Sequence, residues 1–465
     1  MSISEPPTTL GRLSVTAPGA RIRVLDAFLR PVQGATAMDT LTAELDPGAY
    51  RITARIGARE VSRAVLVRAD GPPSDVWLAP DFDAAAPVYT TATANESHGE
   101  LASKLTSGTS TAAGRLVVIL RGLRNRPMAD LPAAATAPAP TVRDQHGEAL
   151  TLPVPAEDPN HVWDPGQENR ALGWAVDVGP GGYRVRWAMP DADTQVEHAL
   201  WIAPHSQTIL FVPQGPAGPV AAGASVHIVP TAVPWDAYAS PTLAVEASLA
   251  VLRSGSIHQR VEVWKRVLAD PSAPPMLGLL TLHEMVRSIG ADLPSDLRRD
   301  AQRRLRQLRR TLGESPDVVA LIATVAPSTV CAQVSWPPML RASHTLLLAG
   351  ERSGRDLIAP GSLLEQVTGQ MYASAPWHIY DPSGLDGPAS LPQPTPPAES
   401  PSAAPQYSGR PGGRSSAGPF DSGDWSRVEG QAHLGEGHEA DATQDELGGA
   451  VSVDHVGPPR SVHSA

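Results

Sequence analysis

The sequence predicts a multidomain protein with separate β and α parts, on the strength of three observations. The hexapeptide PGAYRI at residues 47–52 returns as PGGYRV at residues 180–185. After Trp235 the spacing of apolar residues changes from the period of a strand to that of an α-helix, and after Pro382 apolar residues become rare. We therefore predict two antiparallel β-sandwich modules at 8–83 and 114–232 joined by a linker at 84–113, an all-α bundle or stacked helical pairs at 236–380, and a disordered tail at 382–465.

The first module is predicted from short apolar runs that are separated by turn residues. In YRITARIG (residues 50–57) the apolar side chains alternate with Arg51, Thr53 and Arg55. Because successive side chains of a strand point to opposite faces, we expect one buried face and one face of arginines in water. Pro and Gly before the tyrosine favour a tight turn into this strand. We expect the tyrosine ring to be buried, with its hydroxyl bonded to a partner at the edge.

The second module is predicted as a copy of the first. GRLVV (114–118) is similar to GRLSV (11–15), and QTILFVP (207–213) takes the place of SDVWLAP (74–80). The matching segments lie further apart in the second copy, which indicates inserted loops. The segment between the copies is polar, with one short helix expected at HGELASKL.

The helical part is predicted from start and stop signals. Ser240-Pro241 is a typical helix start, and Gly255 a typical end of the helix that follows. Several further segments of ten to eighteen residues show the same signals. In the tail, ordering each residue would cost on the order of 1–2 kcal/mol of backbone entropy, with little apolar surface to bury in return.

Composition limits the function. The net charge of −11 argues against a protein devoted to nucleic acid, and no run of apolar residues is long enough to span a membrane. No secretory signal is recognisable at the start, and one cysteine, Cys331, cannot form an intramolecular disulfide. We expect a cytoplasmic protein that binds neither membrane nor nucleic acid.

One predicted helix is strongly basic. Residues 295–312 carry an apolar stripe of Leu297, Ala301, Leu305, Leu308 and Leu312, which is one helix face. Three interpretations stay open for its arginines: a solvated face partly paired with Asp296 and Asp300, a docking face for an acidic protein surface, or a face that binds nucleic acid. For the docking face we select Arg299, Arg303, Arg306 and Arg310. The seven arginines are Arg298, Arg299, Arg303, Arg304, Arg306, Arg309 and Arg310.

Catalytic and cofactor motifs are weak. His283-Glu284 begins like HExxH, but Arg287 stands where the second zinc ligand belongs. Cys331 and His344 could form a thiol nucleophile and its base, although no acid or amide nearby is placed to orient the histidine. No phosphate-binding glycine loop or nucleophile elbow occurs. We expect no catalytic residue, no metal and no cofactor.

Two resemblances extend this interpretation. The PGxYR turn and strand of each module resembles carboxypeptidase regulatory-like and PEGA-type β-sandwiches, which implies an adhesion, spacing or regulatory role. LADPSAPPMLGLLTLHEM (268–285) and VSWPPMLRASHTLLLAGE (334–351) are similar to a helical region of uncharacterised bacterial proteins. Some of those proteins are encoded near caspase-like peptidases or other conflict-system components. The resemblance implies a protein partner of that class.

The function we expect is a non-enzymatic intracellular scaffold or regulatory partner in a bacterial multi-protein system. One alternative is a hydrolase with a site between the sandwiches and the helical domain. Another is a carbohydrate- or surface-binding protein, which would need exposed tryptophans gathered on one sheet face. The tryptophans that could form such a face are Trp77, Trp163, Trp174, Trp187 and Trp201.

Overall fold

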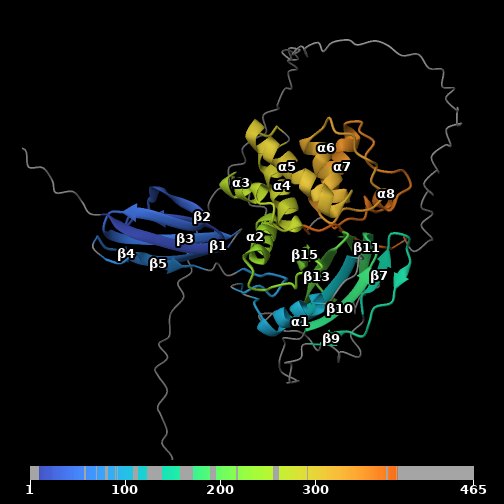
Figure 1. The fold of residues 1–465 in the computed structure, drawn as a ribbon, viewed down its shortest axis with the longest axis horizontal. Coiled ribbons are helices and arrows are strands. Elements are labelled where there is room, and N and C mark those ends of the chain that lie inside the picture. The colour runs from blue at the N-terminus through green and yellow to red at the C-terminus, as the bar shows by residue number, and fades with distance from the viewer. Residues whose placement is uncertain are drawn as a thin grey trace, which may run out of the picture. The chain divides into compact units, whose positions relative to one another are not determined.

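The fold combines antiparallel β-sheets with helices, as the sequence predicts. The structure is a computed structural model that describes residues 10–56, 59–69, 71–78, 82–89, 91, 93–107, 114–122, 139–157, 171–188, 195–215, 218–254, 261–290, 292–372, 375–383 and 385. Within these residues it contains three sheets and eight α-helices (Figure 1). Apart from residues 382, 383 and 385, the predicted tail lies outside the described part, and so does Trp163.

The first sheet has five strands in the order β2-β1-β3-β4, with β5 paired to β1. Neighbouring strands are antiparallel except β5, which runs parallel to β1 and so departs from the purely antiparallel module expected. Ile52, Ala54 and Ile56 are buried and Arg51 and Arg55 are exposed, as the alternation predicts, but Thr53, which was expected on the outer face with the arginines, is buried. The five strands are β1 (Gly11–Leu25), β2 (Pro31–Leu45), β3 (Gly48–Ile56), β4 (Arg59–Val67) and β5 (Ser74–Trp77).

The region 114–230 forms the second and third sheets. The second has the order β14-β13-β6-β10-β9, with β15 paired to β13, and the third has the order β16-β12-β11-β7-β8. Apolar side chains from both sheets meet in one hydrophobic core. The strands are β6 (Gly114–Gly122), β7 (Thr141–Asp144), β8 (Ala149–Leu150), β9 (Ala156–Glu157), β10 (Ala171–Val178), β11 (Gly181–Ala188), β12 (Gln195–Ile202), β13 (Ser206–Gly215), β14 (Gly218–Pro219) and β15 (Ser225–Pro230), with a 3-10 turn η1 (Ala221–Gly223) and a late strand β16 (Ile379–Tyr380).

The pairing pattern of the first sheet recurs in this region. β6 pairs parallel with β13 as β1 does with β5, and β11 pairs antiparallel with β12 as β3 does with β4. The second half of β1 pairs with β3, and the separate strand β7 pairs in the same way with β11. One long strand of the first copy is therefore represented by two strands in the second, with the longer connection between them.

Two turns of the copies match at the level of single hydrogen bonds. The hydroxyl of Tyr50 donates to the carbonyl of Asp46, and that of Tyr183 donates to the carbonyl of Gly179, both at 2.8 Å. Each bond joins the tyrosine to the residue just before Pro-Gly and holds the turn closed. The repeated hexapeptide is therefore a structural device, as its composition suggests.

The second matching turn follows the strand that precedes the repeat. Asp26 Oδ1 accepts the amides of Phe28 and Arg30 at 2.8 and 2.9 Å. Asp144 Oδ1 accepts the amides two and four residues later at the same two distances. Leu29 and Gly147 occupy the corresponding position with positive φ, 63° and 83°. The sequences of these turns differ, so their equivalence is visible only in the structure.

The helices follow the predicted segments closely. Ser315 caps α6 by accepting the amide of Val318, and Ser362 caps the short helix α8 by accepting the amide of Glu365. None of the described helices is long and apolar enough to cross a membrane. The helices are α1 (Glu96–Thr106), α2 (Ser240–Ser254), α3 (Val261–Ala269), α4 (Pro275–Ile289), α5 (Ser295–Leu312), α6 (Pro316–Val325), α7 (Arg341–Arg352) and α8 (Leu363–Val367).

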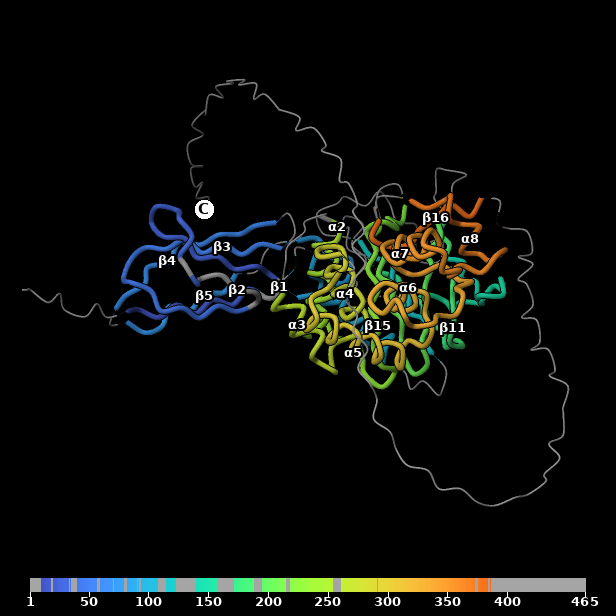
Figure 2. The backbone as a smooth tube through the Cα atoms, turned by 90° about the horizontal axis from the view of Figure 1, so that it is seen from above, coloured from blue at the N-terminus to red at the C-terminus, as the bar shows by residue number. Residues whose placement is uncertain are grey.

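The helical part and the second β region pack into one body. In Figure 1 the yellow and orange helices lie directly against the cyan and green sheets, and one hydrophobic core contains residues from both. Trp201 of β12 donates its indole N–H to the carbonyl of Leu312 at 2.8 Å. After the helices the chain returns to add β16 to the edge of β12; Figure 2 marks it near α8. The predicted boundary near residue 235 is therefore a change of secondary structure and does not separate two cores.

This packing changes the environment of two predicted surface arginines. Arg184 is buried, whereas the matching Arg51 of the first copy is exposed; Arg186 is half-buried, and the matching Thr53 is itself buried. The buried carboxylate of Glu197 pairs with both, at 3.5 and 2.7 Å. Residues of the α8 region and β16 form a small core with Ala199 beside them, so this sheet is covered on both faces. The alternation of side chains predicted the strand correctly, but it could not predict that residues near α8 and β16 cover the second face of the sheet.

The segment predicted as a linker also contains packed structure. Helix α1 lies within it, and Ala84, Ala85 and Val88 are buried. Arg121 of β6, itself buried, donates to the carbonyls of Ala85 and Thr93. These contacts hold the segment against the second sheet, because a buried guanidinium needs several acceptors.

Candidate functional site

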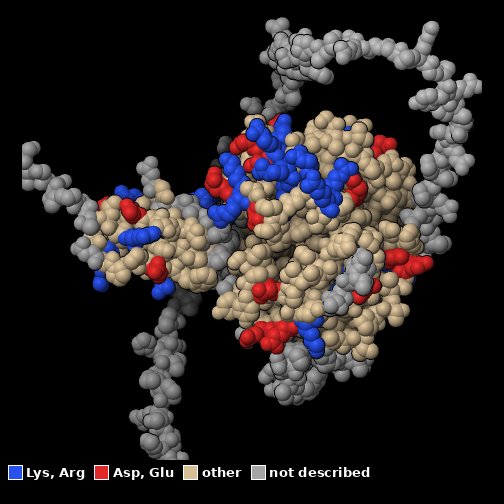
Figure 3. Space-filling view, viewed as in Figure 1, with Lys and Arg blue, Asp and Glu red and all other residues tan. Residues whose placement is uncertain are grey.

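Helix α5 presents the basic face that the sequence predicts. Its five stripe residues are buried, from Leu297 to Leu312. All four arginines selected for docking, Arg299, Arg303, Arg306 and Arg310, are exposed. Figure 3 shows lysine and arginine side chains gathered over α3 and α5. We call the exposed side chains of these four residues the α5 arginine face.

Few acidic side chains neutralise this face. Arg303 pairs with Asp300 at 2.9 Å. Among the described residues, no ion pair or hydrogen bond involves the guanidinium of Arg299, Arg306 or Arg310. Asp296 was expected to pair with an arginine of its own helix, but it contacts Lys265 of α3 at 3.4 Å. The positive charge of the face is therefore left available to a partner.

Three further arginines of the helix differ from these four. Arg298 and Arg309 pair with Asp292 and Glu314. Arg304 is 1% exposed and does not belong to the surface at all. It donates to the carbonyls of Ala273 and Pro274 at 2.6 and 3.2 Å. The predicted basic helix thus includes one arginine that stabilises the turn at residues 270–275, before α4.

The two residues proposed as a thiol nucleophile and base have different surroundings. Cys331 is half-buried, and its thiol lies 3.7 Å from the carbonyl of Thr329. Burial raises the pKa of this thiol, with Glu314 adding to the effect, so the thiolate is disfavoured. His344 is buried, contacts Thr368 at 3.2 Å and stacks on His378. No contact joins the two side chains within the described residues, and the hydrolase hypothesis gains nothing from them.

A buried polar network that the sequence did not reveal lies between α4, α6 and α7. Ser343 Oγ donates to Asp317 Oδ1 at 2.6 Å and lies 2.8 Å from His283 Nε2. Asp317 also accepts the amides of Met339 and Leu340, at 2.8 and 3.0 Å. Burial raises the pKa of Asp317, while these hydrogen bonds oppose the shift. The network attaches the segment that leads into α7 to the start of α6.

This network has a serine, a histidine and an aspartate, but not the arrangement of a catalytic triad. In a triad the histidine stands between the other two, whereas here the serine does. Ser343 and Asp317 are fully buried, so no substrate reaches the hydroxyl. His283 and Glu284 do not form a zinc site with a third ligand: within the described residues, no group of three His, Cys, Asp or Glu side chains is close enough to hold a metal.

The tryptophans do not form the exposed cluster that carbohydrate binding would need. Trp77 is exposed, but Trp174 and Trp187 are buried in the core of the second and third sheets. Trp201 is half-buried and bonded to the end of α5. The described tryptophans therefore serve mainly in packing.

Buried histidines predict a marked acid sensitivity. Burial lowers the pKa of His198, His283 and His378 to about 3 each. In the unfolded chain these side chains titrate near 6.5, so the unfolded state binds protons first as the pH falls. Their contribution to stability is complete above pH 6.5 and is lost progressively towards pH 3. Each can contribute a slope of up to about 1.4 kcal/mol per pH unit.

We expect the free energy of unfolding, measured with denaturant, to fall steeply between pH 6.5 and pH 5. Because the pKa of Asp317 is raised, the folded protein binds a proton there before the unfolded chain does, which stabilises the fold as the pH falls. This effect is confined to pH values near and above the ordinary pKa of 3.8. His198→Gln should reduce the slope by about 1.4 kcal/mol per pH unit. A free energy of unfolding that stays constant over this range would contradict the burial of these histidines.

Comparison with known proteins adds little. No family model matches the chain, and no curated protein matches it. Among solved structures, the chain is similar to the Bacillus anthracis TIE protein at a TM-score of 0.18 and 10% identity, over 43% of this chain and 32% of that one. It is also similar to a candidate cell adhesion protein of Bacteroides fragilis, at a TM-score of 0.15 and 10% identity, over 48% of this chain and 84% of that one. Scores this low carry no argument about fold or function.

Proposed function

We propose that this protein is a non-enzymatic scaffold or regulatory partner that docks an acidic protein surface through the α5 arginine face. The observation that carries the proposal is the exposure of four arginines on one helix, three of them without an ion pair among the described residues. Exposed charges of one sign attract an opposite surface and speed its encounter. The chain as a whole carries a net charge of −11, so a positively charged face is not expected from its overall composition.

The structure of the helix suits docking. Its opposite side is anchored by five buried apolar residues, so the arginines stand on a fixed backbone and lose little freedom on binding. A stable interface needs roughly 1,200–2,000 Å² of buried surface, which one helix and its neighbours can provide. The two β modules would supply spacing or regulatory contacts, in line with their resemblance to carboxypeptidase regulatory-like and PEGA-type modules.

The class of partner follows from the sequence resemblance alone. We propose a partner of the caspase-like peptidase class or another component of a bacterial conflict system, with the complex located in the cytoplasm. A hydrolase activity is not proposed, because Ser343 is fully buried and, within the described residues, no contact joins Cys331 to His344.

Affinity purification with a charge-reversed variant tests this proposal. Arg303→Glu, Arg306→Glu and Arg310→Glu together should remove acidic proteins that the unaltered chain retains, because six units of charge change on one face. A matched control carries Arg59→Glu, Arg63→Glu and Arg68→Glu, three exposed arginines of the first β module. The control should retain the same proteins as the unaltered chain. Equal retention by all three proteins would refute docking through α5.

A further inference from the structure

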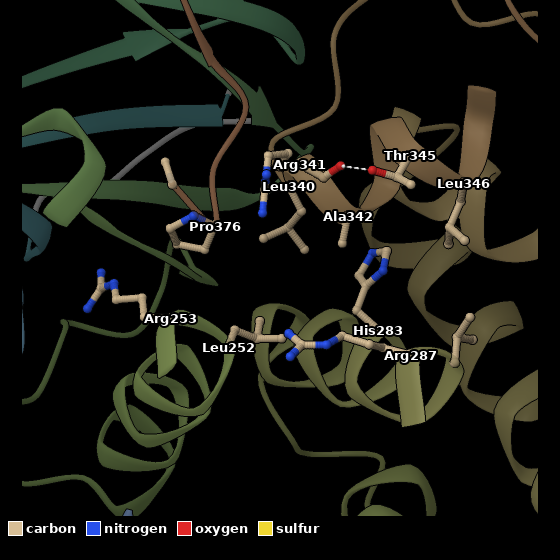
Figure 4. Close-up of a pocket in the computed structure, with 12 residues that line it drawn as sticks. Leu252, Arg253, His283, Arg287, Leu340, Arg341, Ala342, Thr345, Leu346 and Pro376 are labelled. Atoms are coloured by element: carbon tan, nitrogen blue, oxygen red, sulfur yellow. Dashed lines mark hydrogen bonds between the residues drawn. The ribbon is translucent and has the colours of Figure 1, made fainter. Parts of the chain in front are cut away.

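Two tyrosines form an exposed pair where the segment before α1 meets the turn before α2. The ring centroids of Tyr89 and Tyr238 lie 5.0 Å apart at an interplanar angle of 34°, and the two residues are 60% and 59% exposed. Two aromatic rings packed together at the surface form an unusual patch, because tyrosine is enriched at the centres of protein interfaces. The pair shares no residue with the α5 arginine face or with the cavity of about 680 Å³ lined by α2, α4 and α7 that Figure 4 shows.

Two carboxylates lie beside this aromatic surface. Glu96, in the first turn of α1, accepts a hydrogen bond from the hydroxyl of Tyr238 at 3.4 Å. Asp236 accepts the backbone amide of Tyr238 at 2.8 Å, and both acids are exposed. Within the described residues neither acid has an ion-pair partner. The pKa of the Tyr238 hydroxyl is raised, first by loss of hydration and next by the charge of Glu96, which indicates a negative potential beside the ring.

Contacts between three segments hold these four residues in place. The amide of Tyr89 donates to the carbonyl of Ala237 at 3.1 Å, which joins the segment before α1 to the turn before α2. Gly99 of α1 approaches the same turn so closely that an added Cβ would lie 3.2 Å from the side chain of Ala237. Asn95 caps α1 directly before Glu96 by accepting a backbone amide. A ligand would therefore meet a surface that is already ordered, which lowers the entropic cost of binding.

Another turn of the same chain shows which group completes such an arrangement. In the turn after β1, the guanidinium carbon of Arg30 lies 4.9 Å from the ring centroid of Phe28. The Nε of Arg30 also donates to the carboxylate of Asp26 at 2.9 Å, so one guanidinium contacts an aromatic ring and a carboxylate together. The tyrosine pair has the rings and the carboxylates, but no lysine or arginine among the described residues contacts them.

We propose that the tyrosine pair and its two carboxylates bind an arginine side chain of a partner protein. The guanidinium would stack on a tyrosine ring and pair with Glu96 or Asp236. A guanidinium suits both features, because it is planar, stacks on aromatic faces and presents parallel N–H donors to a carboxylate. A lysine ammonium is not planar and is more strongly hydrated, so it should bind less tightly. The site would therefore recognise a basic segment, whereas the α5 arginine face would recognise an acidic surface.

Equilibrium dialysis of the full chain against p-aminobenzamidine tests this site, because the probe joins a flat ring to a planar amidinium cation. We expect saturable binding to one site and displacement of the probe by the peptide acetyl-Gly-Arg-Gly-amide. The same peptide with citrulline, an uncharged isostere of arginine, should displace the probe at least about fivefold less well, and the lysine peptide should lie between the two. Equal displacement by the citrulline peptide would contradict recognition of a cation, and equal displacement by the lysine peptide would contradict stacking of a planar group.

Variants locate the site. Tyr238→Leu and Glu96→Gln should each weaken probe binding about threefold or more, and the double variant about tenfold or more. Phe28→Leu and Glu262→Gln remove an exposed ring and an exposed carboxylate elsewhere, and these matched controls should leave probe binding unchanged. Thermal unfolding of each variant confirms that it is folded. A folded double variant that binds the probe as tightly as the unaltered chain does would overturn the proposal, and so would loss of binding in either control alone.

Discussion

Replacing Asp317 with alanine is expected to lower the free energy of unfolding by about 3–5 kcal/mol, the largest effect that we predict. The Asp317 carboxylate accepts three hydrogen bonds in a fully buried position, from two backbone amides and from Ser343. Alanine would leave the two backbone amides without an acceptor and without access to water, and Ser343 would keep only its contact with His283. The entry into α7 would also lose its attachment to α6. Chemical denaturation at pH 7 measures this loss.

Two variants serve as controls for Asp317. Asp317→Asn keeps the size of the side chain and one oxygen acceptor, so its loss should be smaller than that of the alanine variant. Asp300→Ala removes an aspartate that pairs with Arg303 at the surface of α5, and should cost less than about 1 kcal/mol. If Asp317→Ala proved as mild as Asp300→Ala, the buried network would not secure these helices.

The second large effect is expected at Arg304. Its guanidinium donates to the carbonyls of Asp270, Ala273 and Pro274 and to the side chain of Gln307. Arg304→Ala removes these donors and leaves a space beside α4, which should lower the free energy of unfolding by about 2–4 kcal/mol.

The neighbouring exposed arginine provides the comparison for Arg304. Arg306→Ala lies on the same helix but in water, and should change stability by no more than about 0.5 kcal/mol. Denaturation of the two variants under the same conditions separates a structural arginine from a surface one. Comparable decreases in the free energy of unfolding for both variants would mean that Arg304 does not stabilise the turn before α4.

Local features of the fold were predictable from the sequence. The strand at residues 50–56 follows the alternation of its side chains except at Thr53, which is buried, and α5 shows its buried stripe. The capping serine at Ser315 and the proline after it mark the start of α6. These features depend on neighbours within one or two turns, which is the range at which sequence patterns act.

Features that depend on distant contacts were not predictable. Arg184 resembles Arg51 in its sequence context, yet Glu197 and the covering residues near α8 decide that it is buried. The network of His283, Asp317 and Ser343 joins three helices, and no spacing in the sequence indicates it. Arg304 offered a weak signal, because a helical projection places it at the edge of the apolar stripe beside Leu297.

The most direct test of docking through α5 is the affinity of the purified partner for the charge-reversed variant. With a partner recovered by affinity purification, calorimetry would compare the unaltered chain, the variant at Arg303, Arg306 and Arg310, and the control at Arg59, Arg63 and Arg68. We predict that the dissociation constant rises at least about 100-fold for the α5 variant, stays unchanged for the control, and rises with salt for the unaltered chain. An equal dissociation constant for all three proteins would contradict the proposed function.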